Sequence, residues 1–193
     1  MPGTRADPQR RRRQILDAAL RVAARRGLNQ LTVREVAAQA ELSSGLVFFH
    51  YRSKEALLLG LLDDLLSWLV AGDAAAAARP PTTLPQAICS EISTGRLERE
   101  RTEILLQFWV LGLGSPRIRR RIRAAMKRYQ DLFLSAARQA LAGRSRTAAR
   151  ISPESLAGLS VAVVLGSEIA SLVEAGWFER WNPAAAIEAL LRA

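Results

Sequence analysis

Side chains that commonly perform catalysis are scarce in this 193-residue sequence, which holds one histidine, His50, and one cysteine, Cys89. Metal ions in proteins usually take about three or four protein ligands, so a lone histidine predicts no metal site. The sequence contains no CxxC pair, no HExxH or GxSxG motif and no phosphate-binding glycine motif. We therefore expect no enzymatic activity, no metal and no cofactor, and we interpret Cys89 as a core thiol.

An excess of basic over acidic residues is the most prominent feature of the composition. Lysine and arginine number 28 against 18 acidic residues, which gives a formal net charge of +10 and an isoelectric point near 11.3. The charge lies in two blocks, because residues 1–54 hold 11 basic and 4 acidic side chains and residues 117–150 hold 11 and 1. A surplus of this size is typical of proteins that bind nucleic acids.

The sequence offers few signals for a membrane or for export. No uncharged stretch reaches the roughly 18 apolar residues that span a membrane, because the longest one lies between Glu154 and Glu168. No apolar segment follows the basic residues at the start, so we expect no secretory signal. A single cysteine forms no internal disulfide. We therefore expect a cytoplasmic protein that does not enter a membrane.

Apolar residues recur at helical spacing along nearly the whole chain, and no run alternates in the manner of a strand. This pattern predicts an all-α protein of about nine helices. The first helix is predicted to begin at the N-cap Asp7, with a proline in its first turn, and to end at Gly27. Thr32 and Glu35 match a capping box that opens a short second helix, and Ser43 caps a short third helix.

The second and third helices have the spacing of a helix-turn-helix unit, in which the later helix enters the major groove of DNA. Val47 and Tyr51 lie four residues apart and are predicted to face the core. The opposite face then carries small and apolar side chains, namely Ser44, Gly45 and Phe48, with Leu46 and Phe49 at the flanks. An exposed apolar helix face needs a partner, and a DNA groove supplies thymine methyl groups and phosphates.

A family resemblance rests on the stretch TVREVAAQAELSSGLVFFHYRSKEALL. It is similar to the helix-turn-helix signature of TetR-type transcriptional repressors, and the similarity extends from Gln14 to Leu61. The resemblance implies a homodimeric repressor that binds double-stranded DNA at a palindromic operator and is released by a small-molecule effector. The residues expected to contact DNA are Thr32, Arg34, Ser43, Ser44, Gly45, Leu46, Phe48, Phe49, His50 and Lys54.

Two positions depart from that signature. Glu41 stands where the family usually has a turn glycine, so the turn must either be strained or adopt a negative φ. Phe48 replaces a tyrosine whose hydroxyl commonly contacts a phosphate, which removes one expected hydrogen bond. Nearby polar and basic side chains are candidates to replace this contact, namely Thr32, His50, Lys54 and the arginine arm at residues 10–13.

The resemblance also divides the chain. Residues 1–53 are expected to form the helix-turn-helix domain and residues 54–193 a helical effector-binding and dimerisation domain, joined by a helix over about residues 54–72. Aromatic residues that either line an effector pocket or pack in the core are Trp68, Phe108, Trp109, Phe133 and Trp177. Residues expected in the dimer interface, with packing within the chain as the alternative, are Gly158, Ala162, Gly166, Ala170, Val173, Ile187 and Leu190.

Two questions stay open at this stage. The basic block at residues 117–150 has the pattern of an amphipathic helix, and its charged face is interpreted as solvated, as facing DNA or as binding an anionic effector. The alternative for the whole chain is a DNA-binding protein without an effector, which silences or organises DNA. It would share the amino-terminal features and lack a usable cavity.

Overall fold

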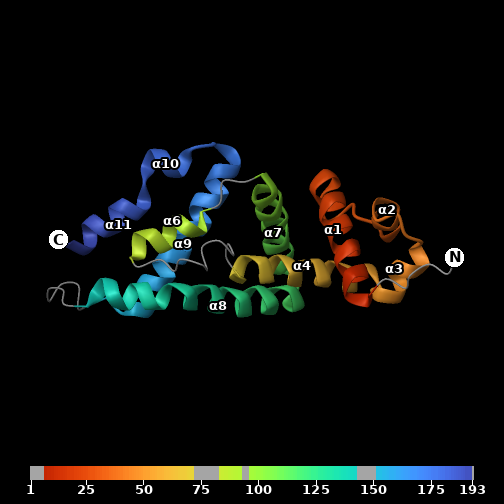
Figure 1. Cartoon of the computed structure of the whole chain (residues 1–193), viewed down its shortest axis with the longest axis horizontal. Helices are drawn as coiled ribbons and strands as arrows, with labels where there is room; N and C mark the ends of the chain where they lie inside the picture. The colour runs from red at the N-terminus through yellow and green to blue at the C-terminus, as the bar shows by residue number, and fades with distance from the viewer. Residues whose placement is uncertain (1–6, 72–82, 93–95, 143–150, 193) are drawn as a thin grey trace. The chain divides into compact units, whose positions relative to one another are not determined.

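The computed structural model describes residues 7–71, 83–92, 96–142 and 151–192, and within them the predicted all-α fold is confirmed (Figure 1). These residues contain the predicted helices and one more, the short α10 (Trp177–Trp181), and no strand. The others are α1 (Pro8–Arg26), α2 (Val33–Gln39), α3 (Ser44–His50), α4 (Lys54–Ala71), α6 (Leu84–Glu91), α7 (Arg96–Gly114), α8 (Pro116–Leu141), α9 (Pro153–Val173) and α11 (Pro183–Arg192).

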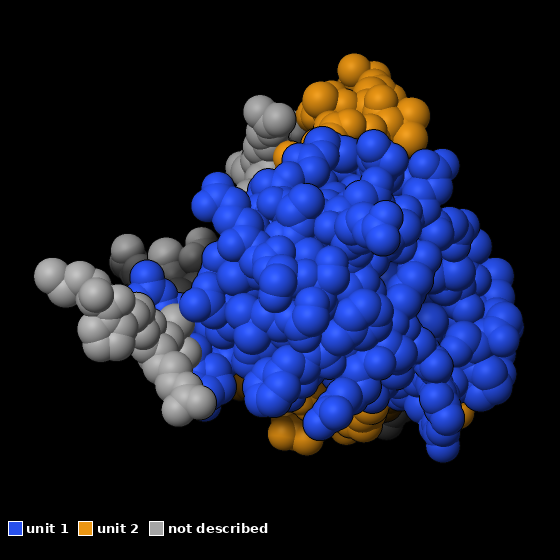
Figure 2. Space-filling view, turned by 90° about the vertical axis from the view of Figure 1, so that its right-hand side faces the viewer, with its two compact units in different colours: residues 1–66, 103–121 blue, residues 67–102, 122–193 orange. Residues whose placement is uncertain are grey.

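The chain divides into two compact units, each built from separate stretches (Figure 2). Unit 1 comprises residues 1–66 and 103–121, and unit 2 comprises residues 67–102 and 122–193. Helices α4, α7 and α8 each contribute residues to both units. The domain boundary expected between residues 53 and 54 lies at the start of α4, inside unit 1, and it stays a prediction.

Helix ends in unit 1 lie at the predicted residues because local side chains cap them. The Asp7 carboxylate accepts a hydrogen bond from the amide of Gln9 at 3.2 Å, and Gly27 ends α1 with a φ of 79°. At the start of α4 the Ser53 hydroxyl accepts a hydrogen bond from the amide of Ala56 at 3.0 Å. Such caps supply partners that the first turn of a helix lacks, and each typically contributes about 1 kcal/mol.

The core of unit 1 is formed by the apolar faces of the first four helices. Its members include Ile15, Ala19, Val22, Ala23, Val36, Ala37, Val47, Leu57, Leu61 and Leu65, which are at most 2% exposed. On α4 Asp63 is exposed, whereas Asp64 is turned toward α1, where its carboxylate lies 3.9 Å from the guanidinium of Arg13.

The core of unit 2 draws on α6, α8, α9 and α11. Its buried members are Leu84, Ala87, Ile88, Tyr129, Phe133, Ala136, Ala137, Leu156, Ala157, Val164, Ala184 and Ile187. Leu132, on the apolar side of α8, is 46% exposed. The interpretation of Cys89 as a core thiol was wrong. Cys89 is exposed, because the buried face of α6 consists of Leu84, Ala87 and Ile88.

Candidate nucleic-acid interface

Helix α3 has the orientation that its sequence predicts. Its inner side is formed by Val47, which is 0% exposed, and by Tyr51 just beyond its end, which is 9% exposed. On the outer side Phe48 is 47% exposed and Phe49 is 69% exposed. Two aromatic rings on the surface of so short a helix leave apolar area for a partner to cover. The orientation is therefore confirmed, whereas the contact of these residues with DNA stays a prediction.

The first turn of α3 leaves room for another molecule. The Ser43 hydroxyl caps it by accepting a hydrogen bond from the amide of Leu46 at 3.2 Å. Ser44 and Leu46 are half-buried, and Gly45 between them is exposed. A Cβ atom built on Gly45 would meet only the Ser43 hydroxyl, at 3.9 Å. Packing within the chain therefore does not require a glycine here, which suits the close approach of an external backbone.

The turn between α2 and α3 contains one residue in the left-handed region. Glu41, where a glycine was expected from the family signature, has a φ of 57°. The neighbouring Leu42 amide donates to the Ala37 carbonyl at 2.9 Å, which closes the turn. Of the two alternatives for this turn, the strained one is therefore present. This conformation costs a residue with a side chain about 1–2 kcal/mol, and the hydrogen bonds back to α2 offset part of that cost.

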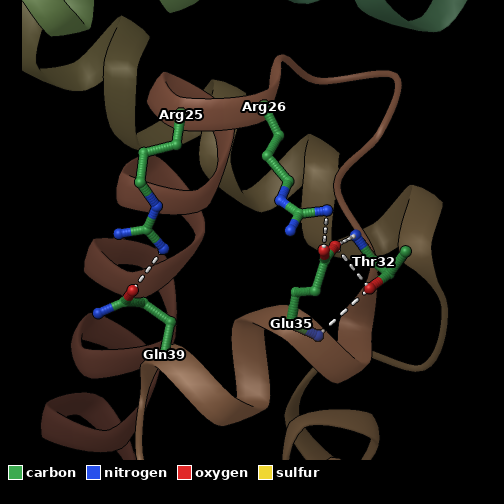
Figure 3. Close-up of polar contacts among 5 residues, drawn as sticks. All are labelled: Arg25, Arg26, Thr32, Glu35 and Gln39. Carbon is green, nitrogen blue, oxygen red and sulfur yellow. Dashed lines mark hydrogen bonds and ion pairs between the residues drawn. The ribbon is translucent and has the colours of Figure 1, made fainter.

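Helix α2 is held by side chains at the end of α1 (Figure 3). Arg26 lies 2.8 Å from the carboxylate of Glu35, and Arg25 donates to the side-chain oxygen of Gln39 at 2.5 Å. The Thr32 hydroxyl accepts from the Glu35 amide at 3.2 Å and donates to the Glu35 carboxylate at 2.8 Å, which confirms the capping box. The hydroxyl proton of Thr32 is thus used within the chain, and a phosphate contact would compete with Glu35.

The four arginines at residues 10–13 lie in the first turns of α1, as the predicted helix requires, and not in an extended arm. The Arg12 guanidinium lies 5.9 Å from the centre of the Tyr51 ring. Burial, followed by the positive charges of Arg12 and Arg11, lowers the pKa of His50. The imidazole is therefore neutral near pH 7, and it lies beside basic side chains of α1.

We expect the affinity for DNA to increase as the pH falls from about 7.5 to 5.5, by about three- to tenfold. A nearby phosphate favours the charged imidazole, so binding takes up a proton that the free protein does not hold. Fluorescence anisotropy at several pH values measures this, with His50→Gln as the comparison. The free protein itself loses stability as the pH falls through the usual histidine pKa, so circular dichroism must accompany each titration. An equal pH dependence in His50→Gln would contradict this role.

Lys54 and Arg34 are exposed at the starts of α4 and α2. The Lys54 ammonium group donates a hydrogen bond to the carbonyl of Asn29 at 3.0 Å, which holds it beside the loop that precedes α2. An ammonium group has two further N–H donors, and these remain available for a phosphate.

We predict that Lys54→Ala weakens binding to all DNA sequences to a similar extent and lowers the slope of log affinity against log salt by about 1. Titrations at several salt concentrations measure the slope. The matched control is Lys127→Ala, which removes the other lysine, paired with Asp131 at 2.5 Å in α8. A slope that changes equally in both variants would argue against a local phosphate contact.

Comparison with known proteins supports this interface. The sequence profile described as "Bacterial regulatory proteins, tetR family" matches residues 15–61, which include all of α2 and α3. The HTH-type transcriptional regulator BetI of Brucella anthropi is 30% identical over 174 residues, which cover 87% of this chain and 88% of that protein. The chain belongs to the tetR family. It is accordingly a DNA-binding transcriptional regulator of the helix-turn-helix type.

Other matches agree with this membership of the tetR family. The transcriptional repressor KstR2 of Mycolicibacterium smegmatis is 40% identical over 68 residues, which cover 35% of this chain and only 33% of KstR2. A TetR-family regulator from Rhodococcus sp. has a TM-score of 0.78 at 21% identity, over 95% of this chain and 100% of that one. A regulator from Saccharomonospora viridis in complex with choline has a TM-score of 0.72 at 22% identity, over 95% and 94%. At these identities the two structures show the shared fold alone.

The aromatic residues proposed for an effector pocket are divided between the units. Phe108 and Trp109 belong to unit 1, whereas Trp68, Phe133 and Trp177 belong to unit 2. Phe108 and Phe133 are at most 1% exposed, and the other three are half-buried. In unit 2 the Arg101 guanidinium lies 5.4 Å from the centre of the Trp68 ring. A role of these residues in ligand binding stays a prediction.

Unit 2 also holds a polar pair that sequence reasoning missed. Tyr129 is 1% exposed, packs edge to face on Phe133 with ring centres 5.7 Å apart, and shares a hydrogen bond with Glu91. Burial raises the pKa of Glu91, and the tyrosine hydrogen bond opposes this shift. The two residues come from α6 and α8, so no local pattern signals the pair. A few polar groups in an apolar core are typical of ligand sites.

Helix α9 carries an uncovered apolar stripe. Leu159 is 49% exposed, Ile169 is 38% exposed and Val173 is 91% exposed. Ala162 and Gly166 between them are also exposed, and nothing lies within 4 Å of a Cβ atom built on Gly166. Steps of three and four residues place all five on one helical face. We call this face the α9 stripe.

The other residues proposed for the dimer interface have different surroundings. Leu190 of α11 is 78% exposed, whereas Ile187 is 6% exposed and packs in the core of unit 2. Gly158 and Ala170 are half-buried.

Helix α9 is, by length and composition, long and apolar enough to cross a membrane. No membrane segment was predicted here because Glu154 and Glu168 leave no uncharged stretch of the required length.

Proposed function

We propose that the protein is a cytoplasmic homodimeric repressor that binds a palindromic operator and leaves it when a small-molecule effector binds. The observation that carries the DNA-binding step is the outer face of α3. Phe48 and Phe49 are exposed beside Gly45, at which a side chain would meet almost nothing within the chain. Arg11 and Arg12 of α1 lie near His50 at the end of α3, and Lys54 begins α4 four residues later. Base contacts of α3 would therefore be combined with phosphate contacts of these basic residues.

The α9 stripe supports the dimer. A soluble monomer rarely leaves so much contiguous apolar surface on one helix, and small residues at Ala162 and Gly166 allow a second helix to approach closely. A second copy of the same face satisfies this need with two-fold symmetry. Two copies of α3 would then read two half-sites separated by about one helical turn of DNA.

The interior of unit 2 supports the effector. Tyr129, Phe133 and Glu91 combine aromatic surface with a polar pair in the core, and elsewhere in unit 2 Trp68 lies beneath the Arg101 guanidinium. The structurally similar Saccharomonospora protein holds choline, a small organic molecule. Helix α4 has Lys54 in its first turn and Trp68 near its other end. A ligand that prefers a displaced α4 would weaken DNA binding by the same coupling energy, and about 1–3 kcal/mol gives a 5- to 150-fold effect.

Selection of bound DNA from a random pool tests the proposal. A palindrome with half-sites about one turn apart is expected, because each protomer contributes one recognition helix. Enrichment of single, unpaired half-sites would contradict the dimer, and no enrichment at all would contradict sequence-specific binding.

Thermal shifts against a compound panel test the effector step. A compound that stabilises the protein and also lowers operator affinity is expected. A panel that includes quaternary ammonium, acyl and aromatic compounds but shifts nothing would favour the alternative, a DNA-binding protein without an effector.

A further inference from the structure

The basic residues at the start of α8 have different partners from one another. The Arg117 guanidinium lies 2.9 Å from the carboxylate of Glu55, and Arg121 pairs with Asp63. Both acids belong to α4, and all four residues lie in unit 1. These two arginines are therefore neutralised within the chain, and they fasten the first turns of α8 along α4 (Figure 1).

Arg119 and Arg120 lie between them in the sequence and are exposed. Neither forms an ion pair with any residue in the described parts of the chain. Arg119 donates one hydrogen bond to the carbonyl of Leu113 at 3.2 Å, which orients the side chain and leaves its charge uncompensated. Residues 117–121 include four arginines and no acid. Like charges so close repel one another, and an anionic partner would relieve this repulsion.

The contact of Arg117 with Glu55 places the start of α8, which also carries Arg119 and Arg120, beside the first turn of α4. Glu55 directly follows Lys54 in the first turn of α4, and α4 begins four residues after the end of α3. Arg117 reaches that turn from the first turn of α8. Arg119 and Arg120 therefore add positive charge to unit 1 close to the first turn of α4, and this charge complements a nucleic-acid backbone.

We propose that Arg119 and Arg120 bind backbone phosphates of DNA outside the groove that α3 enters. This proposal rests on the proposed DNA-binding function and adds a second, sequence-independent contact from the helical half of the chain. On the basic face of α8, Arg117 and Arg121 would then hold α4, whereas Arg119 and Arg120 would hold DNA.

The test compares two double variants of the full chain. Arg119→Ala with Arg120→Ala removes the proposed contact, and Arg123→Ala with Arg128→Ala removes two exposed arginines of the same helix that lie in unit 2. Each is titrated with a labelled random-sequence duplex over a salt series. For the first variant we expect the slope of log affinity against log salt to fall by about 2, and the affinity near 0.1 M salt to fall by about tenfold or more. The second variant keeps the wild-type slope.

Additional variants and a pyrophosphate control distinguish a phosphate contact from other roles of the two arginines. Lysine at both positions is expected to restore the slope, which a purely structural role of the arginines would not allow. If the alanine variant fails to fold, glutamine at both positions replaces it. Equal slopes in the two double variants, or an unchanged slope in the first, would overturn the proposal. A thermal shift by inorganic pyrophosphate that disappears in the first variant, with its DNA slope unchanged, would assign the pair to a small anion instead. Wild-type protein that binds no DNA would instead refute the proposed function.

Discussion

Gly45→Leu is expected to lower the affinity for operator DNA by about 100-fold, or roughly 3 kcal/mol, while the fold remains intact. Within the chain a Cβ at this position meets only the Ser43 hydroxyl at 3.9 Å, and Gly45 is exposed, so we expect the rest of the leucine side chain to extend into solvent in the free protein. Leucine also favours a helix over glycine by about 0.5–1 kcal/mol, so the melting temperature should stay equal or rise. Affinity and stability are therefore expected to change in opposite directions.

The matched control for this substitution is Gly114→Leu. Gly114 is the last residue of α7 and has nothing within 4 Å of an added Cβ, so it also tolerates a side chain. Its operator affinity should equal that of the wild type in an electrophoretic mobility or anisotropy assay. If Gly45→Leu binds the operator as tightly as the wild type, the start of α3 does not approach DNA closely.

Ala162→Glu is expected to convert the dimer to a monomer and to reduce operator affinity by about 100-fold or more. Ala162 lies in the middle of the α9 stripe and is exposed in the single chain. Two symmetry-related carboxylates at this point would be desolvated close to each other, which the apolar contact cannot offset. Loss of the second recognition helix then removes the benefit of simultaneous binding to two half-sites.

Light scattering coupled to size-exclusion chromatography measures the oligomeric state, and circular dichroism checks that the variant is folded. The control is Ala124→Glu, which introduces the same side chain at an exposed alanine of α8 in the same unit. It should remain dimeric with wild-type affinity. A dimeric Ala162→Glu would mean that copies of the chain associate through another surface.

Helix ends and inner faces of unit 1 agree with expectations that use only neighbouring residues. Asp7, Thr32, Ser43 and Gly27 act within about one helical turn of their own positions, so their types suffice to mark where helices begin and end. The same holds for the inner face of α3, because spacing of four residues puts Val47 and Tyr51 together whatever lies beyond.

Expectations that depended on distant partners were less successful. Cys89 was expected in the core and lies outside it, and the contact of Asp64 with Arg13 was not foreseen. The Tyr129–Glu91 pair was not foreseen. In each case the outcome depends on which helix lies opposite, and helical periodicity carries no information about the neighbour.

The amino-acid sequence alone therefore specified an all-helical chain, the residues that cap its helices in unit 1 and the outward face of the recognition helix. These features follow from contacts within one or two helical turns. The left-handed conformation at Glu41 is local as well, because the amides of Glu41 and Leu42 donate back to the carbonyls of Ala38 and Ala37 at the end of α2. Tertiary packing decided which arginines of α8 are neutralised, because Glu55 and Asp63 come from a helix more than fifty residues earlier. Ion pairs between positions this far apart in the sequence form only when folding brings the two helices together.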